Sequence, residues 1–97
     1  MEKRFEKSEK WLERQLVKKI GERGGVALKY SNAQRTGYPD RLVLMPGGRV
    51  YFVELKSKGR KPTRLQSLRH EELRALGFGV AVVDSPEALD DFLLRTL

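Results

Sequence analysis

Two apolar runs joined by a very short turn constrain the fold of this chain most strongly. The runs cover residues 41–45 and 49–56, and only Pro46-Gly47-Gly48 lies between them. A connection of this length pairs neighbouring strands as an antiparallel hairpin. Because the start of one strand then lies beside the end of the other, the turn brings Asp40 and Glu54 together. Glu54 and Lys56 are two residues apart, so both point to the same face of the second strand.

Two carboxylates beside a lysine at the end of an apolar hairpin are costly in free energy. Like charges repel at close range, and burial adds a desolvation penalty. Asp40 also fits a turn residue after proline, and Glu54 with Lys56 fits a surface ion pair. However, Glu54 interrupts the hydrophobic run of its strand, where a charge needs compensation. We therefore interpret Asp40 and Glu54 as ligands of a divalent cation, which would offset both penalties.

Composition favours a polyanionic partner. The chain carries 20 Lys and Arg against 13 Asp and Glu, a net charge of +7. Nucleic acid is the commonest partner of such a basic domain, with an anionic membrane surface or no specific partner as alternatives. The absence of cysteine excludes disulfides, thiolate metal sites and cysteine nucleophiles, and it fits a cytoplasmic or otherwise intracellular protein. No run approaches the ~18 apolar residues of a membrane span, and the N-terminus lacks an apolar signal region.

The hydrophobic pattern predicts one small α/β domain over residues 1–97. We expect a helix over 4–22, strands over 26–30, 41–45 and 49–56, a helix over 64–76, a strand over 78–83 and a helix over 86–94. The order is αβββαβα. The helix between the third and fourth strands would place those two strands parallel by a right-handed crossover. The last strand is apolar on both faces, which indicates a parallel or central position.

Several predicted segments carry distinguishing residues. Residues 31–39 are polar and indicate a mobile loop, and residues 57–62 form a basic loop. In the second helix, Leu65, Leu68 and Leu76 lie on or near one face. The first helix has an apolar stripe at helical spacing, made by Phe5, Leu12, Leu16 and Ile20 with Trp11 and Val17 beside it.

The motif Pro39-Asp40, a hairpin and Glu54-x-Lys56 resembles the PD-(D/E)XK nuclease superfamily, and most closely its VRR-NUC family, the virus-type replication-repair nucleases. The matching stretches are 37–44, 46–56, Gln66 and 76–83, so the resemblance runs over nearly the whole chain. It implies a restriction-endonuclease-like αβββαβ core, a small mixed sheet flanked by helices, and a Mg²⁺- or Mn²⁺-dependent deoxyribonuclease. Stand-alone members resemble Holliday-junction resolvases, which implies branched DNA as substrate, a role in DNA repair and a homodimer. A phage-encoded protein also fits this resemblance.

The resemblance further implies roles for individual residues. Asp40, Glu54 and the backbone carbonyl of Leu55 would bind one or two Mg²⁺ or Mn²⁺ ions, and Lys56 would position the attacking water and neutralise charge on the phosphate. A glutamate of the first helix would join the site. Glu13 matches best and Glu9 is the second choice, whereas Glu2, Glu6 and Glu22 are expected to pair with neighbouring cations, as Glu6 with Lys10.

Gln66 has two interpretations that remain open together. The resemblance implies contact with phosphate or a metal-bound water, whereas the sequence Thr63-x-x-Gln66 predicts a capping box at the start of a helix. His70 is expected on the surface rather than as a general base. Tyr30 and Tyr38 either stack on a splayed base or pack within the protein. For DNA phosphates we expect Lys58, Arg60, Lys61, Arg64, Arg35 and Arg41, with a solvated basic loop as the alternative.

Two questions about the whole protein also stay open at this point. A non-catalytic nucleic-acid-binding module with the same fold is the main alternative function, although the intact Asp40, Glu54 and Lys56 argue against it. An enzyme acting on RNA or single-stranded DNA is a further alternative. For the homodimer we expect an apolar patch on the Trp11 side of the first helix or on the last helix at Phe92 and Leu93.

Overall fold

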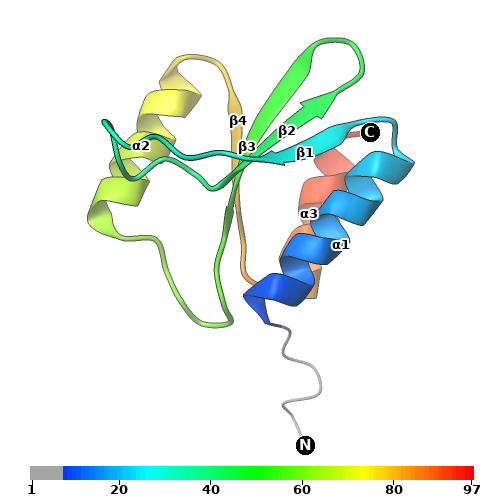
Figure 1. Ribbon diagram of the computed structural model, residues 1–97, viewed down its shortest axis with the longest axis horizontal. Helices are drawn as coiled ribbons and strands as arrows, with labels where there is room; N and C mark the ends of the chain where they lie inside the picture. Colours follow the sequence, from blue (N-terminus) through cyan, green and yellow to red (C-terminus); the bar gives the residue numbers. More distant parts are fainter. Residues whose placement is uncertain (1–7) are drawn as a thin grey trace, which may run out of the picture.

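The computed structural model describes residues 8–97. Its elements are α1 (Glu9–Glu22), β1 (Val26–Lys29), β2 (Arg41–Met45), β3 (Arg49–Leu55), α2 (Arg64–Ala75), β4 (Gly79–Val83) and α3 (Pro86–Arg95) (Figure 1). This order is the predicted αβββαβα. The first helix starts later than predicted, because Ser8 has an extended backbone and caps the helix that begins at Glu9. Glu2, Phe5 and Glu6 lie outside the described residues. No helix within 8–97 is long and apolar enough to span a membrane.

The sheet has the predicted mixed topology. Its strand order is β1-β2-β3-β4, with antiparallel pairing from β1 to β3 and parallel pairing of β3 with β4. In the hairpin, Arg41 lies opposite Val53 and Met45 lies opposite Arg49. Gly47 and Gly48 in the turn both have positive φ angles, of 83° and 75°, a conformation that other residues rarely adopt. The α/β fold class predicted from the hairpin and the crossover is therefore confirmed.

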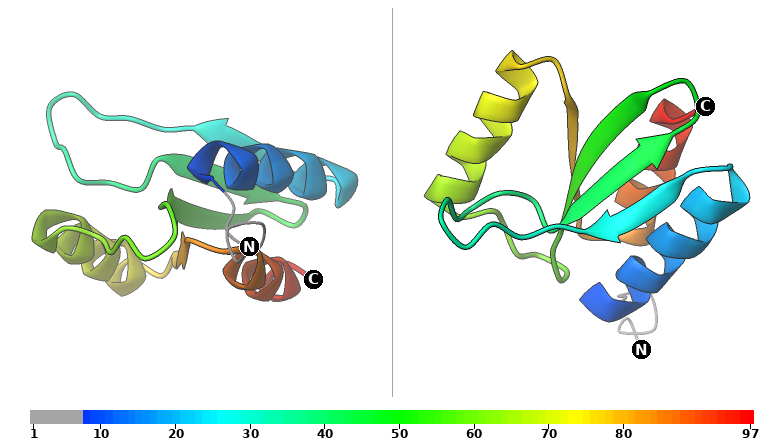
Figure 2. Two further views of the ribbon diagram at one scale, coloured as in Figure 1. Left: turned by 90° about the horizontal axis from the view of Figure 1, so that it is seen from below. Right: turned by 45° about the horizontal axis from the view of Figure 1, so that its top comes forward.

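Two helices cover one face of this sheet. Leu12, Leu16 and Ile20 of α1 are fully buried against the sheet, and Ser8 caps the helix by accepting a hydrogen bond from the Trp11 amide. The helix α3 lies beside α1, as the right-hand view of Figure 2 shows. Its N-terminus is capped by Ser85, and Pro86 occupies the first turn, where proline is well tolerated.

The buried face of α3 corrects one expectation. Phe92 and Leu93 are only 1% and 4% exposed and belong to the hydrophobic core. The Phe92 ring packs edge-on against Tyr51 with 5.6 Å between the ring centroids. The proposed dimer patch on these two residues is therefore wrong, because the core needs them to join α3 to the sheet.

The helix α2 stands alone on the opposite face, apart from α1 and α3 (Figures 1 and 2). Its buried residues are His70 and Leu73, whereas the three leucines of the predicted apolar face, Leu65, Leu68 and Leu76, are all exposed. The apolar leucine face expected for α2 is therefore wrong, and so is the surface position expected for His70. A hydrophobic pattern cannot identify a histidine that is buried because it contacts a polar side chain of the sheet, here Glu54.

Because α2 contacts mainly β4, part of this sheet face stays open. Val26 and Leu28 of β1 point away from buried Ala27, and Leu44 of β2 points away from buried Val43. Val26 lies directly opposite Leu44. These three side chains, between 38% and 48% exposed, form what we call the open sheet face. The last strand, β4, is covered on both sides by α2 and α3, which explains its uniformly apolar sequence even though it is the last strand in the order.

Candidate active site

The hairpin places Asp40 beside Glu54, as its register predicts. Asp40 precedes β2, and its backbone carbonyl accepts a hydrogen bond from the Tyr30 amide at 2.9 Å. Its side chain reaches across to β3, where Oδ1 accepts a hydrogen bond from the Leu55 amide at 3.1 Å. Leu55 follows Glu54 directly, so the carboxylate of Asp40 is fixed next to the strand end that carries Glu54.

Burial dominates the electrostatics of Asp40 and Glu54. Glu54 is only 3% exposed. Burial, and after it the negative charge of Asp40, raise the pKa of Glu54 to about 7 despite the nearby charge of Lys56. Burial also raises the pKa of Asp40, although the Leu55 amide acts in the opposite direction. A positive charge between the two would favour both ionised forms.

These side chains open onto a hollow of about 440 Å³. Asp40, Glu54, Lys56 and Gln66 all line it, and so does Glu9 from the first turn of α1. The rest of the wall comes from Leu55 and the loop between β1 and β2, through Tyr30, Ser31, Asn32, Arg35, Thr36, Gly37 and Tyr38. The structure thus gathers in one place four of the five residues expected to act in catalysis, together with the second-choice glutamate.

Glu13 has a different position. Its carboxylate forms an ion pair with Arg41, whose side chain is almost fully buried at the start of β2. The hydrogen bond from Arg41 lowers the pKa of Glu13. Glu13 does not line the hollow described above but shares an adjacent depression of about 340 Å³ with Lys29 and Asp40.

The capping-box interpretation of Gln66 is confirmed, and the same side chain also contacts Glu54. Its backbone amide donates to Thr63 Oγ1 at 3.1 Å, and its side-chain Oε1 accepts from the Thr63 amide at 2.9 Å, which completes the predicted capping box. The remaining end of the same amide group, Nε2, donates to Glu54 Oε2 at 3.3 Å. The helix cap therefore also determines which end of Gln66 faces the site.

His70 was expected on the surface and that expectation is wrong. Its side chain is 3% exposed, and Nε2 lies 3.4 Å from Glu54 Oε1. His70 follows Gln66 by one helical turn, so both residues face β3. The spacing Gln66-x-x-x-His70, which puts both side chains on one face of the helix, is the sequence signal for this position.

The basic residues fall into two groups. Lys58, Arg60, Lys61 and Arg64 are exposed, in or next to the loop that follows Lys56. Arg35 is also exposed, although its guanidinium is paired with Glu72 at 3.3 Å. In contrast, Arg41 is buried against Glu13, so its guanidinium is not open to a phosphate, and its expected place among the DNA-contacting residues is corrected.

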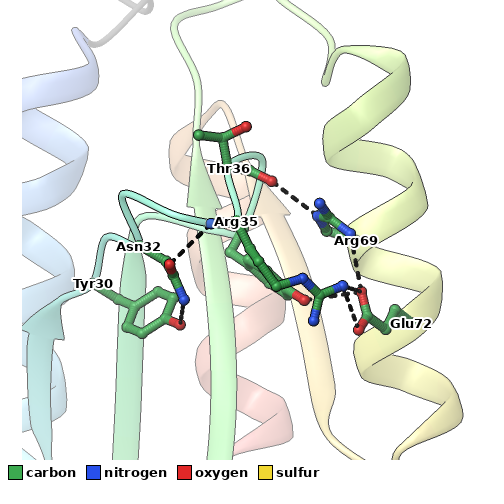
Figure 3. Close-up of polar contacts among 7 residues, drawn as sticks. Tyr30, Asn32, Arg35, Thr36, Arg69 and Glu72 are labelled. Atoms are coloured by element: carbon green, nitrogen blue, oxygen red, sulfur yellow. Dashed lines mark hydrogen bonds and ion pairs between the residues drawn. The ribbon is translucent and has the colours of Figure 1, made fainter.

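The loop between β1 and β2 is fastened to α2, although its composition indicates mobility (Figure 3). Glu72 accepts hydrogen bonds from Arg35 and from the Tyr38 hydroxyl, the latter at 3.0 Å, and Arg69 Nε donates to the Thr36 carbonyl at 2.9 Å. Both guanidinium groups also lie over the Tyr38 ring. Tyr30 packs edge-on against Tyr38 and Phe52, so both tyrosines pack within the protein.

The donor set fits a hard divalent cation that keeps some of its water. Within residues 8–97 no group of three or more His, Cys, Asp and Glu side chains is close enough to enclose a metal ion. Magnesium sites commonly use one or two carboxylates and complete their octahedron with water and substrate oxygens. Asp40 and Glu54 supply such oxygens, and burial raises the pKa of both carboxyl groups.

Comparison with known proteins identifies the family. The chain is 45% identical over 76 residues to a protein of Acyrthosiphon pisum secondary endosymbiont phage 1 named "Putative nuclease p44", with 78% of this chain and 82% of that protein covered. A solved structure described as "VRR_NUC domain" matches with a TM-score of 0.85 and 30% identity, covering 94% of this chain and 100% of that one. No family model matches the chain. The similarity in sequence and in fold confirms the resemblance drawn from the hairpin motif, and the chain belongs to the VRR-NUC family of nucleases.

Proposed function

We propose that this protein is a metal-dependent endonuclease that hydrolyses DNA phosphodiester bonds, with residues 1–97 acting as a single nuclease domain. The observation that carries the proposal is the pairing of Asp40 and Glu54 at one hollow with Lys56 beside them. A structural ion pair would not leave a buried and a half-buried carboxylate with raised pKa values facing an open cavity.

Asp40, Glu54 and the backbone carbonyl of Leu55 would hold Mg²⁺ or Mn²⁺. The bound cation would supply charge stabilisation at the phosphate and lower the pKa of a coordinated water. The Leu55 amide holds the Asp40 carboxylate in place, and Gln66 does the same for Glu54. Lys56 places a positive charge at the same hollow, where it would orient the attacking water and balance the charge that develops on the phosphate.

We infer from the surroundings of Glu9 and Glu13 which of them acts at the site. Glu9 lines the hollow with Asp40 and Glu54, and its charge contributes to the raised pKa of Glu54. Glu13 is engaged by Arg41. We therefore give Glu9 the direct role toward the cation or its water, and Glu13 the role of holding Arg41 and, through it, the start of β2.

The DNA would lie across the basic loop that follows Lys56. Lys58, Arg60, Lys61 and Arg64 are exposed there, and they continue directly from the strand end that carries the catalytic residues. Phosphate contacts from lysine and arginine give affinity without sequence preference. Arg35 would add a further contact on the opposite wall of the hollow.

The proposed substrate is branched DNA such as a Holliday junction, cut by a homodimer. A two-fold dimer matches a symmetric junction because each subunit then faces one of two equivalent strands. The open sheet face formed by Val26, Leu28 and Leu44 is the apolar surface that we propose for the dimer contact, in place of the buried Phe92 and Leu93. The Trp11 side of α1 stays the second candidate.

A cleavage assay on linear, nicked, flapped and four-way DNA tests these proposals together. We expect cutting with Mg²⁺ or Mn²⁺, no cutting in excess chelator, and the highest rate on the four-way junction. The variant Asp40→Asn serves as the matched control, because it should still bind DNA while cutting none. Binding of every substrate without any cleavage would support the non-catalytic binding module, whereas equal rates on all four substrates would overturn only the junction preference.

A further inference from the structure

The one histidine of this chain has no role in the chemistry described above, yet it is buried beside a catalytic carboxylate. His70 lies on the sheet-facing side of α2, and its Nε2 atom is 3.4 Å from Glu54 Oε1. It does not line the hollow, since Gln66 is the only α2 residue that does. His70 therefore contacts Glu54 on the side away from the cavity, and a phosphate would enter from the cavity side.

Gln66 occupies the other oxygen of the same carboxylate. Its Nε2 atom donates to Glu54 Oε2, and it cannot turn its carbonyl toward Glu54 without losing the hydrogen bond from the Thr63 amide. The two carboxylate oxygens of Glu54 thus each face one nitrogen from consecutive turns of a single helix. Two contacts at two oxygens fix the plane of a carboxylate, whereas one contact leaves it free to rotate.

The protonation state of Glu54 determines which nitrogen of the His70 imidazole must carry hydrogen for the two to form a hydrogen bond. An ionised carboxylate has no proton and only accepts hydrogen bonds, so the nitrogen that faces it must carry hydrogen. Each carboxylate oxygen has two lone pairs, so a hydrogen bond from α2 leaves one free on the cavity side. A methionine or leucine of similar volume would fill the space but would leave one oxygen of a buried carboxylate without its donor.

We propose that His70 is a positioning residue of the nuclease site, which donates its Nε2 hydrogen to Glu54 Oε1 and, together with Gln66, orients the Glu54 carboxylate toward the divalent cation. This inference rests on the proposed function, in which Glu54 is a metal ligand. Hydrogen-bond partners of metal ligands commonly contribute about 10- to 100-fold to metal affinity or activity.

The variants His70→Met and His70→Gln separate hydrogen bonding from packing. Calorimetry with Mg²⁺ should show binding about 10-fold weaker in His70→Met than in the wild type. His70→Gln keeps an N–H donor at a similar distance from the backbone and should recover most of that affinity. Cleavage should follow the same order, through kcat and with an unchanged KM for DNA, because His70 does not reach the DNA.

Leu73→Ala provides the matched control for loss of packing. Leu73 is the other buried residue of α2 and lies one turn beyond His70, and no hydrogen bond joins it to Glu54. This variant should unfold at lower urea concentration and still bind Mg²⁺ as the wild type does. Equal loss of affinity in Leu73→Ala and His70→Met, or no loss in His70→Met, would overturn the inference. A wild-type protein that binds no divalent cation would instead overturn the proposed function.

Nuclear magnetic resonance of the wild type gives a test that needs no variant. Because the chain has a single histidine, its imidazole nitrogens give one unambiguous pair of signals. At pH 8 with saturating Mg²⁺ we expect the tautomer that carries hydrogen on Nε2. The opposite tautomer, with hydrogen on Nδ1, would contradict the proposed donation to Glu54.

Discussion

Arg41 and Glu13 form an ion pair that joins the start of β2 to the middle of α1. The arginine is almost fully buried, and it is the immediate neighbour of Asp40 in the chain. This pair therefore distinguishes Glu13 from Glu9, the other candidate acid of α1. Glu13 pairs with Arg41, and we propose that it stabilises the fold beside the site, whereas Glu9, one turn earlier, lines the cavity.

Exchanging each glutamate for alanine should separate these two roles. Glu13→Ala leaves a buried guanidinium without its partner and should lower the free energy of unfolding by about 2–3 kcal/mol. Glu9→Ala removes an exposed side chain and should change that free energy by less than about 0.5 kcal/mol, while it lowers the cleavage rate. Urea denaturation and a cleavage assay on both variants provide the measurement. An inactive but fully stable Glu13→Ala protein would reverse the assignment.

The raised pKa of Glu54 predicts how stability depends on pH when no metal is present. The folded protein holds the Glu54 proton up to about pH 7, whereas an ordinary glutamate releases it near 4.5. This group therefore stabilises the fold fully below pH 4.5, and its contribution is lost as the pH rises through 7. The shift corresponds to about 3 kcal/mol.

Glu54→Gln should remove that loss, because glutamine does not ionise. In chelator, the variant should gain stability relative to the wild type between pH 5 and pH 8, as measured by urea denaturation. Burial lowers the pKa of His70, so His70 changes stability with pH in the opposite direction. Adding Mg²⁺ at pH 8 should stabilise the wild type and not the variant. A constant difference between the two proteins across this pH range would contradict the prediction.

Substitutions at the catalytic residues should divide cleavage from binding. Asp40→Asn removes a negative charge near the phosphate with little change of shape, so it should abolish cleavage and leave DNA affinity equal or higher. Lys56→Ala should be nearly inactive but still bind metal, since an ammonium group is not a ligand. Mn²⁺ should support cleavage at least as well as Mg²⁺, and Ca²⁺ should bind without turnover because its looser geometry positions water poorly. Near-native activity of Asp40→Asn would refute the site.

The basic loop should bind DNA by charge alone. Affinity should fall steeply with salt concentration, because lysine and arginine displace counterions from the phosphates. Charge reversal at Lys58, Arg60 or Lys61 should weaken binding equally for all sequences and reduce the salt dependence. Arg95→Glu is the matched control, since Arg95 is exposed at the end of α3, near the start of β3 rather than its catalytic end. Titrations by fluorescence anisotropy distinguish these outcomes, and an equal effect of Arg95→Glu would argue against a localised DNA surface.

Sedimentation at micromolar concentration tests the dimer. We expect about twice the chain mass of 11.2 kDa. Leu28→Glu places a charge on the open sheet face and should give a folded monomer with reduced activity on four-way junctions. Phe92→Glu, by comparison, should unfold the protein because Phe92 is in the core. If the wild type stays monomeric even on junction DNA, the homodimer is excluded and the simpler nuclease proposal remains.

Sequence patterns predicted the parts of this molecule that depend on neighbouring residues. The hairpin, the turn glycines, the capping box of α2 and the crossover all follow from local spacing, and so does the meeting of Asp40 with Glu54. The errors concern partners that are distant in the sequence. The burial of His70 depends on a glutamate of β3, and the burial of Phe92 depends on how α3 packs against Tyr51. Glu9 and Glu13 occupy successive turns of one helix, so only their tertiary contacts tell them apart.

The turn Pro46-Gly47-Gly48 has a consequence for how this protein tolerates change. Side chains of a strand alternate between its two faces, so inserting one residue in the turn would slide β3 against β2 and exchange Glu54 with Val53 or Leu55. A carboxylate would then enter the hydrophobic core while a core residue faced the cavity. The loop of residues 57–62 joins β3 to α2 outside the hairpin, so extra residues there leave the strand register intact. Length variation between relatives of this protein should therefore accumulate in the basic loop and be absent from the turn.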